Sequence, residues 1–373
     1  MTRVGVIVVF GGYGTFGSLV ARALAADGLQ LRIAGRDAGR AARFASDLGL
    51  RHEGIAADAS DPTSCAAALA GARVAVSCVG PFHADGLGLA LPEACLAAGI
   101  HYVDIADDRA WLARLRGLGE RFRERKLIAA CGCSSLPGIS GALALVAAEG
   151  LHRVEQARIT LFIGNANPKG TAAVASAASQ LGRSFRAPQG DLVGLRGREV
   201  VSLPPPFGRR AVHDLDSPEY DLFPDLLGAR EVRVKVGFES RLATASFVAL
   251  SYLGPHLGAR VASVFGRAAG LFSRFGHSGG FVQVELWDSD GRCATACLGG
   301  PREGQRMAAL PAAFVARDLL EGRIAARGFL TAWEALGARP LLDRLEAAGF
   351  DLRVQTPEDH GRGGRGGCAE QGD

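Results

Sequence analysis

An apolar strand that runs directly into three closely spaced glycines limits what this chain can fold into. Val4 to Phe10 is an almost continuous β-branched and apolar run, as expected for a strand buried on both faces of a parallel sheet. The segment Gly12-Tyr-Gly-Thr-Phe-Gly17 follows it. Apolar residues then recur at the spacing of one helical face: Phe16, Leu19, Val20, Ala23 and Leu24. A strand, a G-x-G-x-x-G turn and an amphipathic helix in this order indicate a dinucleotide-binding unit.

Each glycine of this motif has its own physical role. Gly12 permits the tight turn, Gly14 lets the backbone approach a pyrophosphate, and Gly17 lets the helix pack on the strand. The helix N-terminus then offers N–H groups to the phosphates. We therefore expect cofactor contacts from the whole motif, namely Gly12, Tyr13, Gly14, Thr15, Phe16 and Gly17.

The end of the next expected strand, Leu29 to Ala34, bears on which dinucleotide binds. An NAD-binding unit places Asp or Glu about twenty residues after the glycines, where the carboxylate accepts from the ribose 2′-hydroxyl. Here Gly35 and Arg36 take that place, and Asp37 stands one step later, where it would cap the next helix. Arg36 can pair with a 2′-phosphate, the alternative being an exposed surface arginine. The sequence thus favours NADP(H) over NAD(H).

Strand and helix patterns continue to alternate through the first third of the chain. Further strands are expected to end near Ala57 and to cover 73–79, 100–106 and 126–132. This alternation implies right-handed βαβ crossovers. It predicts an α/β fold with a Rossmann-type, doubly wound parallel sheet.

The pattern changes after Gly150, where strand-like runs become longer and alternate. These runs are Ala157–Gly164, Arg230–Phe238, Phe281–Asp288 and Arg292–Gly299, and a hairpin turn signal at 289–291 joins the last two. A helical pattern returns from Gly304 through Leu320. We expect a Rossmann domain over 1–135, joined by a returning helical segment at about 305–350. A second, mostly antiparallel α+β domain is expected over 136–304, and a disordered Gly-rich tail over 360–373.

The composition of the chain limits the classes of partner that it is expected to bind. A net charge of +4 spread along 373 residues does not indicate a nucleic acid, so a small-molecule substrate is expected. Arg3 is followed at once by a strand-like run, which argues against a signal peptide. The eight cysteines lack metal-ligand spacing, so no metal is expected and a reducing cytoplasm fits.

One apolar region needs separate interpretation. Leu242 to Ala259 carries no charge but contains Pro255, which favours a buried or interface helix over a membrane span, with a lipid-facing role as the alternative. Apolar residues continue to Phe275, and we expect them to exceed what one small domain can bury. Because such a surface usually finds a partner, the sequence predicts a homodimer formed mainly through the second domain.

The motifs resemble a known family. "GGYGTFG", the strand end "AGRD", "VGPFHADGLGLALPEACLAAGIHYVDIADD" and "CGCSSLPGISG" are similar to stretches of the saccharopine dehydrogenase-like reductases, as is "LLEGRIAARGF". The resemblance implies a Rossmann domain paired with an α+β domain that carries substrate and dimer contacts. Family members include enzymes that reduce a Schiff base and lipid-linked enoyl reductases.

The resemblance also implies roles for individual residues. By position, Asp58 would lie near the adenine, and Val79, Gly80 and Pro81 would border the nicotinamide ribose. Asp104 corresponds to the family's aspartate in "YVD".

Hydride transfer needs one proton donor besides the oriented cofactor. Candidates lie past the C-terminal ends of strands. His83 follows the fourth strand and titrates near neutrality, unless it is a surface loop histidine. Asp104 and Asp107 follow the fifth strand, although Asp104 has the alternative role of capping a turn.

These features predict an NADPH-dependent oxidoreductase that reduces a small or apolar C=N, C=O or C=C acceptor. One alternative is an enoyl reductase acting on a lipid-like substrate, which the uncharged region from Leu242 favours. Another is an NADP-binding regulator or scaffold without turnover. The sequence lacks the G-x-S-x-G motif of many hydrolases.

Overall fold

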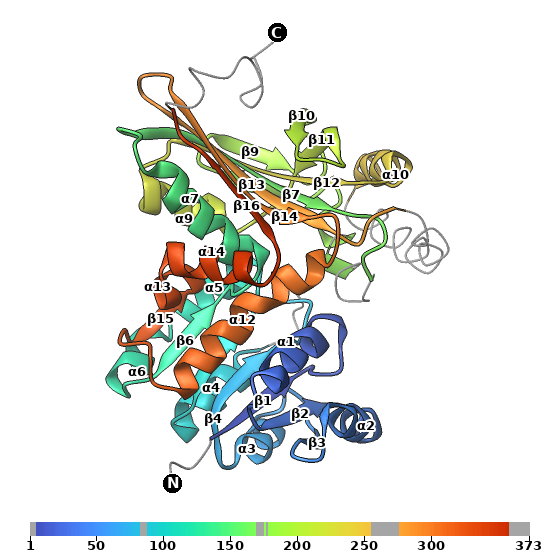
Figure 1. Cartoon of the computed structure of the whole chain (residues 1–373), viewed down its shortest axis with the longest axis vertical. Coiled ribbons are helices and arrows are strands. Elements are labelled where there is room, and N and C mark those ends of the chain that lie inside the picture. The colour runs from blue at the N-terminus through green and yellow to red at the C-terminus, as the bar shows by residue number, and fades with distance from the viewer. Residues whose placement is uncertain (1–4, 83–87, 169–174, 177, 255–275, 358–373) are drawn as a thin grey trace. The chain divides into compact units, whose positions relative to one another are not determined.

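The computed structural model describes residues 5–82, 88–168, 175–176, 178–254 and 276–357 (Figure 1). The chain divides into two compact units. The first comprises Met1–Ser134 and Ala308–Gly337, and the second Ser135–Met307 and Ala338–Asp373. The sequence predicts two separately folding domains, and their limits stay a prediction. The expected tail, 360–373, lies outside the described residues.

The first unit is built on a seven-stranded, fully parallel sheet in the order β15-β6-β5-β4-β1-β2-β3. Its strands are β1 (Val6–Phe10), β2 (Leu31–Gly35), β3 (Glu53–Ala56), β4 (Ala72–Ser77), β5 (His101–Asp104), β6 (Ile128–Cys131) and β15 (Gly328–Thr331). Strand order reverses between β1 and β4, which is where an open α/β sheet binds its ligands. The predicted doubly wound sheet is confirmed.

Helices connect these strands, and the first of them is the one that the apolar periodicity after the glycine motif predicted. They are α1 (Thr15–Ala26), α2 (Ala38–Leu48), α3 (Pro62–Leu69), α4 (Ala90–Ala98), α5 (Arg109–Arg116), α6 (Gly119–Glu124) and α13 (Ala332–Leu336), and α12 (Gly304–Leu320) runs across the boundary of the two units. Residues Ile7 to Phe10 of β1 are fully buried, so this strand is covered on both faces. The sheet core therefore follows from the continuous apolar run with which the chain begins.

The second unit contains a seven-stranded mixed sheet in the order β10-β11-β12-β7-β13-β14-β16 and a two-stranded sheet, β8-β9. The strands are β7 (Val154–Ile163), β8 (Ser184–Ala187), β9 (Gly190–Val193), β10 (Glu199–Leu203), β11 (Gly208–Asp214), β12 (Glu231–Phe238), β13 (Gly280–Asp288), β14 (Cys293–Gly300) and β16 (Asp351–Gln355). In the large sheet β12 and β7 pair in parallel and the other pairs are antiparallel. The mostly antiparallel second domain is confirmed.

Helices cover one face of this large sheet. α7 (Ser140–Ala148) packs on β13 and β14, and α9 (Glu219–Leu227) packs on β12 (Figure 1). α14 (Ala338–Ala347) packs on α7, and α10 (Arg241–Ser251) contacts β12. Residues of α7 are almost all buried.

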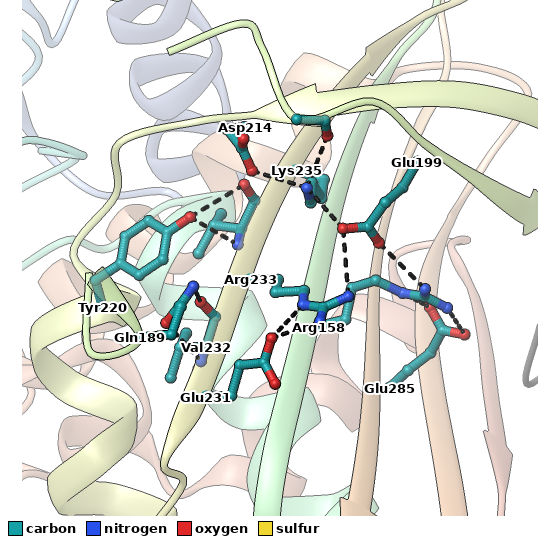
Figure 2. A network of polar contacts seen from close by, with 12 residues as sticks. Arg158, Gln189, Glu199, Asp214, Tyr220, Glu231, Val232, Arg233, Lys235 and Glu285 are labelled. Carbon is teal, nitrogen blue, oxygen red and sulfur yellow. Dashed lines mark hydrogen bonds and ion pairs between the residues drawn. The ribbon is translucent and has the colours of Figure 1, made fainter. Parts of the chain in front are cut away.

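Other strand positions of the same sheet carry a buried network of charged side chains (Figure 2). Arg158 on β7 donates through Nε and Nη2 to the two carboxylate oxygens of Glu285 on β13, at 2.9 and 2.7 Å. Glu199 on β10 lies 3.3 Å from Arg158 and 2.7 Å from Lys235. Lys235 also pairs with Asp214 at 2.8 Å. Because buried charges are costly unless paired, these contacts hold five strands in register.

We predict that Arg158→Met destabilises the protein by about 3–5 kcal/mol, because it leaves the carboxylate of Glu285, only 1% exposed, without its bidentate partner. Chemical denaturation measures the change. Arg339→Met is the matched control, since Arg339 pairs with Asp343 on the exposed surface of α14 and should cost less than about 1 kcal/mol. Equal losses in the two variants would contradict a structural role for the network.

Candidate functional site

The glycine-rich turn between β1 and α1 forms a backbone cradle. Gly11 has a φ of 70°, in the region that favours glycine, and its carbonyl accepts from Gly14 N at 2.8 Å. A Cβ at Gly14 would lie 3.0 Å from that carbonyl oxygen, and a Cβ at Gly17 would overlap it. α1 begins at Thr15 without a side-chain cap. The first N–H groups of α1 are thus left to bind an anion such as a pyrophosphate.

The end of β2 lies beside this cradle and carries positive charge. Arg36 is exposed directly after the strand. The carboxylate of Asp37 accepts from Arg40 N at 2.9 Å and caps α2, as predicted. Because Asp37 is engaged by the helix, the strand end offers a guanidinium and no free acid. This arrangement suits a ribose 2′-phosphate.

Tyr13 takes part in a contact that the sequence did not predict. Its hydroxyl accepts from Asp37 N at 3.0 Å, and the guanidinium of Arg40 lies 4.7 Å from its ring centroid. A local sequence pattern does not reveal this contact, because Tyr13 and Arg40 are brought together only by the pairing of β1 with β2.

Asp58 follows β3 at the same edge of the sheet. It accepts from the hydroxyl and the backbone N–H of Ser60, at 2.7 and 2.9 Å, and these bonds lower its pKa. The positive charge of Arg36 lowers the pKa further, which indicates that the two side chains share one electrostatic environment. The predicted place of Asp58 near an adenine stays a prediction.

The segment after β4 approaches the glycine-rich turn. Cys78 N donates to Phe10 O at 2.9 Å, and a Cβ at Gly11 would lie 2.9 Å from Cys78 O. Val79, Gly80 and Pro81 follow, with a cis peptide bond between Gly80 and Pro81. These three residues therefore flank the point where strand order reverses, as expected for neighbours of the nicotinamide ribose.

Asp104, at the end of β5, is fully buried and surrounded by donors. Oδ2 accepts from Trp111 Nε1 at 2.7 Å and contacts Cys131 Sγ at 3.4 Å. Oδ1 accepts from the backbone N–H groups of Ala106 at 3.1 Å and Gly132 at 2.9 Å. Burial raises its pKa and these bonds partly oppose the rise. Asp104 thus ties the ends of β5 and β6 to α5, and its catalytic role stays a prediction.

Asp107 differs from Asp104 because its side chain is exposed. The protein atoms around it nevertheless remove enough water to raise its pKa to about 6, and the charges of Asp108 and Asp104 add to the rise. A carboxyl that solvent can reach and whose pKa is raised to about 6 gives up its proton closer to neutral pH than an ordinary aspartate, which is a property of a proton donor.

His83 and the cysteines are the remaining residues for which the sequence makes a prediction. His83 lies outside the described residues. Cys131 and Cys133 are buried free thiols, and burial raises the pKa of each, consistent with their interpretation as small core residues. Within the described residues, no group of three or more potential ligands could hold a metal ion, and no helix there has the length and apolarity to cross a membrane.

Comparison with known proteins agrees with this geometry. Residues 7–125 match the family model of the saccharopine dehydrogenase NADP-binding domain. The chain is thus similar to this family through its NADP-binding domain. The cofactor of the family domain, NADP, is the one that the charge at the end of β2 predicts.

Two named proteins and one solved structure are also similar to this chain. Two Mycobacterium tuberculosis proteins, each named "Putative trans-acting enoyl reductase", are 34% identical over 139 residues, which cover 35% of this chain and 33% of each relative. The match thus spans about a third of their length. Apo saccharopine dehydrogenase (L-Glu forming) from Saccharomyces cerevisiae has the same fold, with a TM-score of 0.64 and 14% identity over 94% of this chain and 100% of that one.

Proposed function

We propose that this protein is an NADPH-dependent oxidoreductase that transfers a hydride to a small or apolar C=N, C=O or C=C acceptor. The main support is the combination of a glycine cradle with an exposed Arg36 and no free acid at the end of β2. Gly12 to Gly17 would hold the pyrophosphate, Arg36 the 2′-phosphate, and Val79 to Pro81 would border the nicotinamide ribose. NADPH, when bound, supplies the hydride, and the chain positions it.

We predict that the purified protein consumes NADPH in the presence of one class in a panel of imines, ketones and enoyl thioesters. Arg36→Ala should raise the Kd for NADPH by roughly tenfold or more, because a charge-assisted hydrogen bond is lost, and should leave the Kd for NADH nearly unchanged. Fluorescence titration measures both constants. Tighter binding of NADH than of NADPH by the wild-type protein would refute the cofactor assignment.

We also propose Asp107 as the proton donor. Reduction of a polar double bond by hydride leaves an anion, which an adjacent acid must protonate. Asp107 is exposed after β5, at the edge where open α/β sheets bind ligands, and its pKa is raised to about 6. Asp104 supports the same segment through its bond to Ala106 N and holds α5 through Trp111.

The sign of the pH dependence follows from the protonation state that an acid needs. Asp107 carries its proton below about pH 6 and loses it above, so kcat/KM should fall as pH rises through about 6. Asp107→Asn should remove this limb and slow the reaction by roughly 10²-fold or more.

Asp108→Asn is the matched control. Asn preserves the cap that Asp108 makes with Trp111 N at 2.8 Å, so the rate at the optimum should be kept. Loss of the neighbouring negative charge should shift the falling limb to lower pH. An unchanged pH profile in Asp107→Asn would exclude Asp107 as the donor.

A second candidate function is an enoyl reductase acting on a lipid-like substrate. The names of the two Mycobacterium tuberculosis relatives favour it. So does the surface around α10, where the large apolar side chains of Leu242, Tyr252 and Leu253 are exposed. Consumption of NADPH with enoyl thioesters alone would select this function, whereas tight NADPH binding without consumption on any acceptor would favour the non-catalytic regulator.

The same exposed residues support a homodimer formed through the second unit. Phe247 and Leu250 of α10 pack against the buried cluster that contains Leu181 and Val236, so the inner side of the helix is already used. Each large apolar side chain removed from water stabilises by roughly 1.5–3 kcal/mol, so a few of them can hold two subunits together. The other apolar residues of 255–275 lie outside the described residues.

We predict that the wild-type protein sediments as a dimer at micromolar concentration, and that replacing Leu242 and Leu253 together with Ser shifts it toward monomer. Leu50→Ser is the control, because Leu50 is a fully exposed leucine of the first unit. A wild-type monomer would overturn the dimer, and a monomer obtained only in detergent would support a lipid-facing surface instead.

For its location we propose the cytoplasm. Cys65, Cys95, Cys131 and Cys133 are free thiols in the core. Cysteines stay free in a reducing compartment, so these four favour this location, whereas Cys293 is disulfide-bonded.

A further inference from the structure

The ring of Tyr13 fills the space that a side chain at position 35 would need. A Cβ built on Gly35 would lie 2.5 Å from Tyr13 Cε1 and 2.7 Å from both Cζ and Oη. Gly35 does not have the positive φ that would by itself require glycine. The glycine is therefore required by the tyrosine ring and not by the backbone.

The ring is fixed where it lies by two further contacts. Its hydroxyl accepts from Asp37 N at 3.0 Å, and Arg40 stacks on its face at 4.7 Å. A side chain at position 35 would have to push the ring out and lose both contacts. Position 35 is one of the two strand-end positions at which an NAD-binding chain would hold its ribose-reading acid.

The stacked Arg40 lies in the first turn of α2. A cation is unfavourable at a helix N-terminus, where the dipole is positive, and here the capping carboxylate of Asp37, which accepts from Arg40 N at 2.9 Å, offsets part of that cost. Arg36 adds a second exposed guanidinium just before the helix. An anion bound at this point would be stabilised by both guanidinium groups and by the helix dipole.

We propose that Tyr13 is a cofactor-specificity residue: it excludes an acid from position 35 and holds Arg40 for the 2′-phosphate of NADP(H). The proposal rests on the proposed use of NADP(H) and assigns selectivity to the contact of three side-chain positions, 13, 35 and 40. It implies that the NAD-type acid is blocked by packing, so introducing it requires removal of the tyrosine.

A melting experiment on the cofactor-free protein tests the packing without any ligand. Gly35→Ala should lower Tm when Tyr13 is present, because the new Cβ displaces the ring. In the Tyr13→Ala background the same change should leave Tm unchanged or raise it, because Ala restricts the unfolded chain more than Gly. An equal effect of Gly35→Ala in both backgrounds would overturn the packing part of the proposal.

Binding of adenosine 2′,5′-bisphosphate and of adenosine 5′-monophosphate, measured by calorimetry, tests the selectivity. Tyr13→Ala and Arg40→Ala should each weaken the bisphosphate by roughly tenfold, with less than twofold change for the monophosphate, because one charge-assisted contact is lost. The double variant should be no weaker than either single variant. Tyr13→Phe should restore most of the selectivity, because the ring that carries Arg40 is kept.

The matched control is Arg22→Ala. Arg22 lies over the ring of Phe44 at 5.2 Å, between α1 and α2. This variant therefore also removes one positive charge and one stack of an arginine on an aromatic ring. It should leave the ratio of the two affinities unchanged, and an equal drop would show that net charge alone sets the ratio.

Finally, Gly35→Asp should bind NADH better than NADPH only when combined with Tyr13→Ala. A switch of cofactor preference by Gly35→Asp alone would refute the proposal.

Failure of the proposed function gives a different result. If the wild-type protein bound neither adenosine 2′,5′-bisphosphate nor NADPH, the use of NADP(H) and with it the selectivity role of Tyr13 would be refuted. The melting cycle between positions 13 and 35 would still report whether the ring requires the glycine.

Discussion

The close approach of α1 to the end of β1 is the constraint on which the first unit depends. A Cβ at Gly17 would overlap the carbonyl of Gly11, so α1 can reach this position only with glycine there. The approach puts the first turn of α1 at the point where strand order reverses, beside the residues that follow β4. One steric requirement therefore fixes the direction of the helix and also exposes its N–H groups, which is why the fold and the phosphate site come from the same residues.

The second unit differs from the first because its large sheet buries charged as well as apolar side chains. α7 covers an apolar side, whereas Arg158, Lys235 and Glu285 occupy neighbouring strands and are paired with acids or bases there. Buried ion pairs add little net stability compared with apolar packing, but they penalise every register that separates them. We infer that the network contributes mainly to the specificity of strand pairing, and a shift of β7 against β13 by one residue would separate Arg158 from Glu285.

Local patterns predicted the elements whose signal lies within the segment itself. The continuous apolar runs at β1 and β7 and the hairpin between β13 and β14 were found within a few residues of their ends. The strands β15 and β16 were not predicted, because four or five residues such as "GFLT" carry no clear periodicity and are strands only through pairing with β6 and β14. The site divides in the same way. The glycine turn and the Asp37 cap are local, whereas the bond from Trp111 to Asp104 required the fold.

The contact of Tyr13 with Gly35 shows why cofactor selectivity is difficult to read from a single strand end. Residues 34–36 show only that an acid is absent from this strand end. An acid can be missing through neutral drift of the sequence as well as through selection for NADP(H). The structure offers a physical cause, since the tyrosine ring occupies the space that a Cβ at position 35 would need and is itself held by Asp37 N and Arg40. Arg40 in turn brings a guanidinium to the first turn of α2, which Asp37 caps. A chain that needed only a sharp turn between β1 and α1 would have no reason to combine these three features, whereas a site for a 2′-phosphate uses all of them.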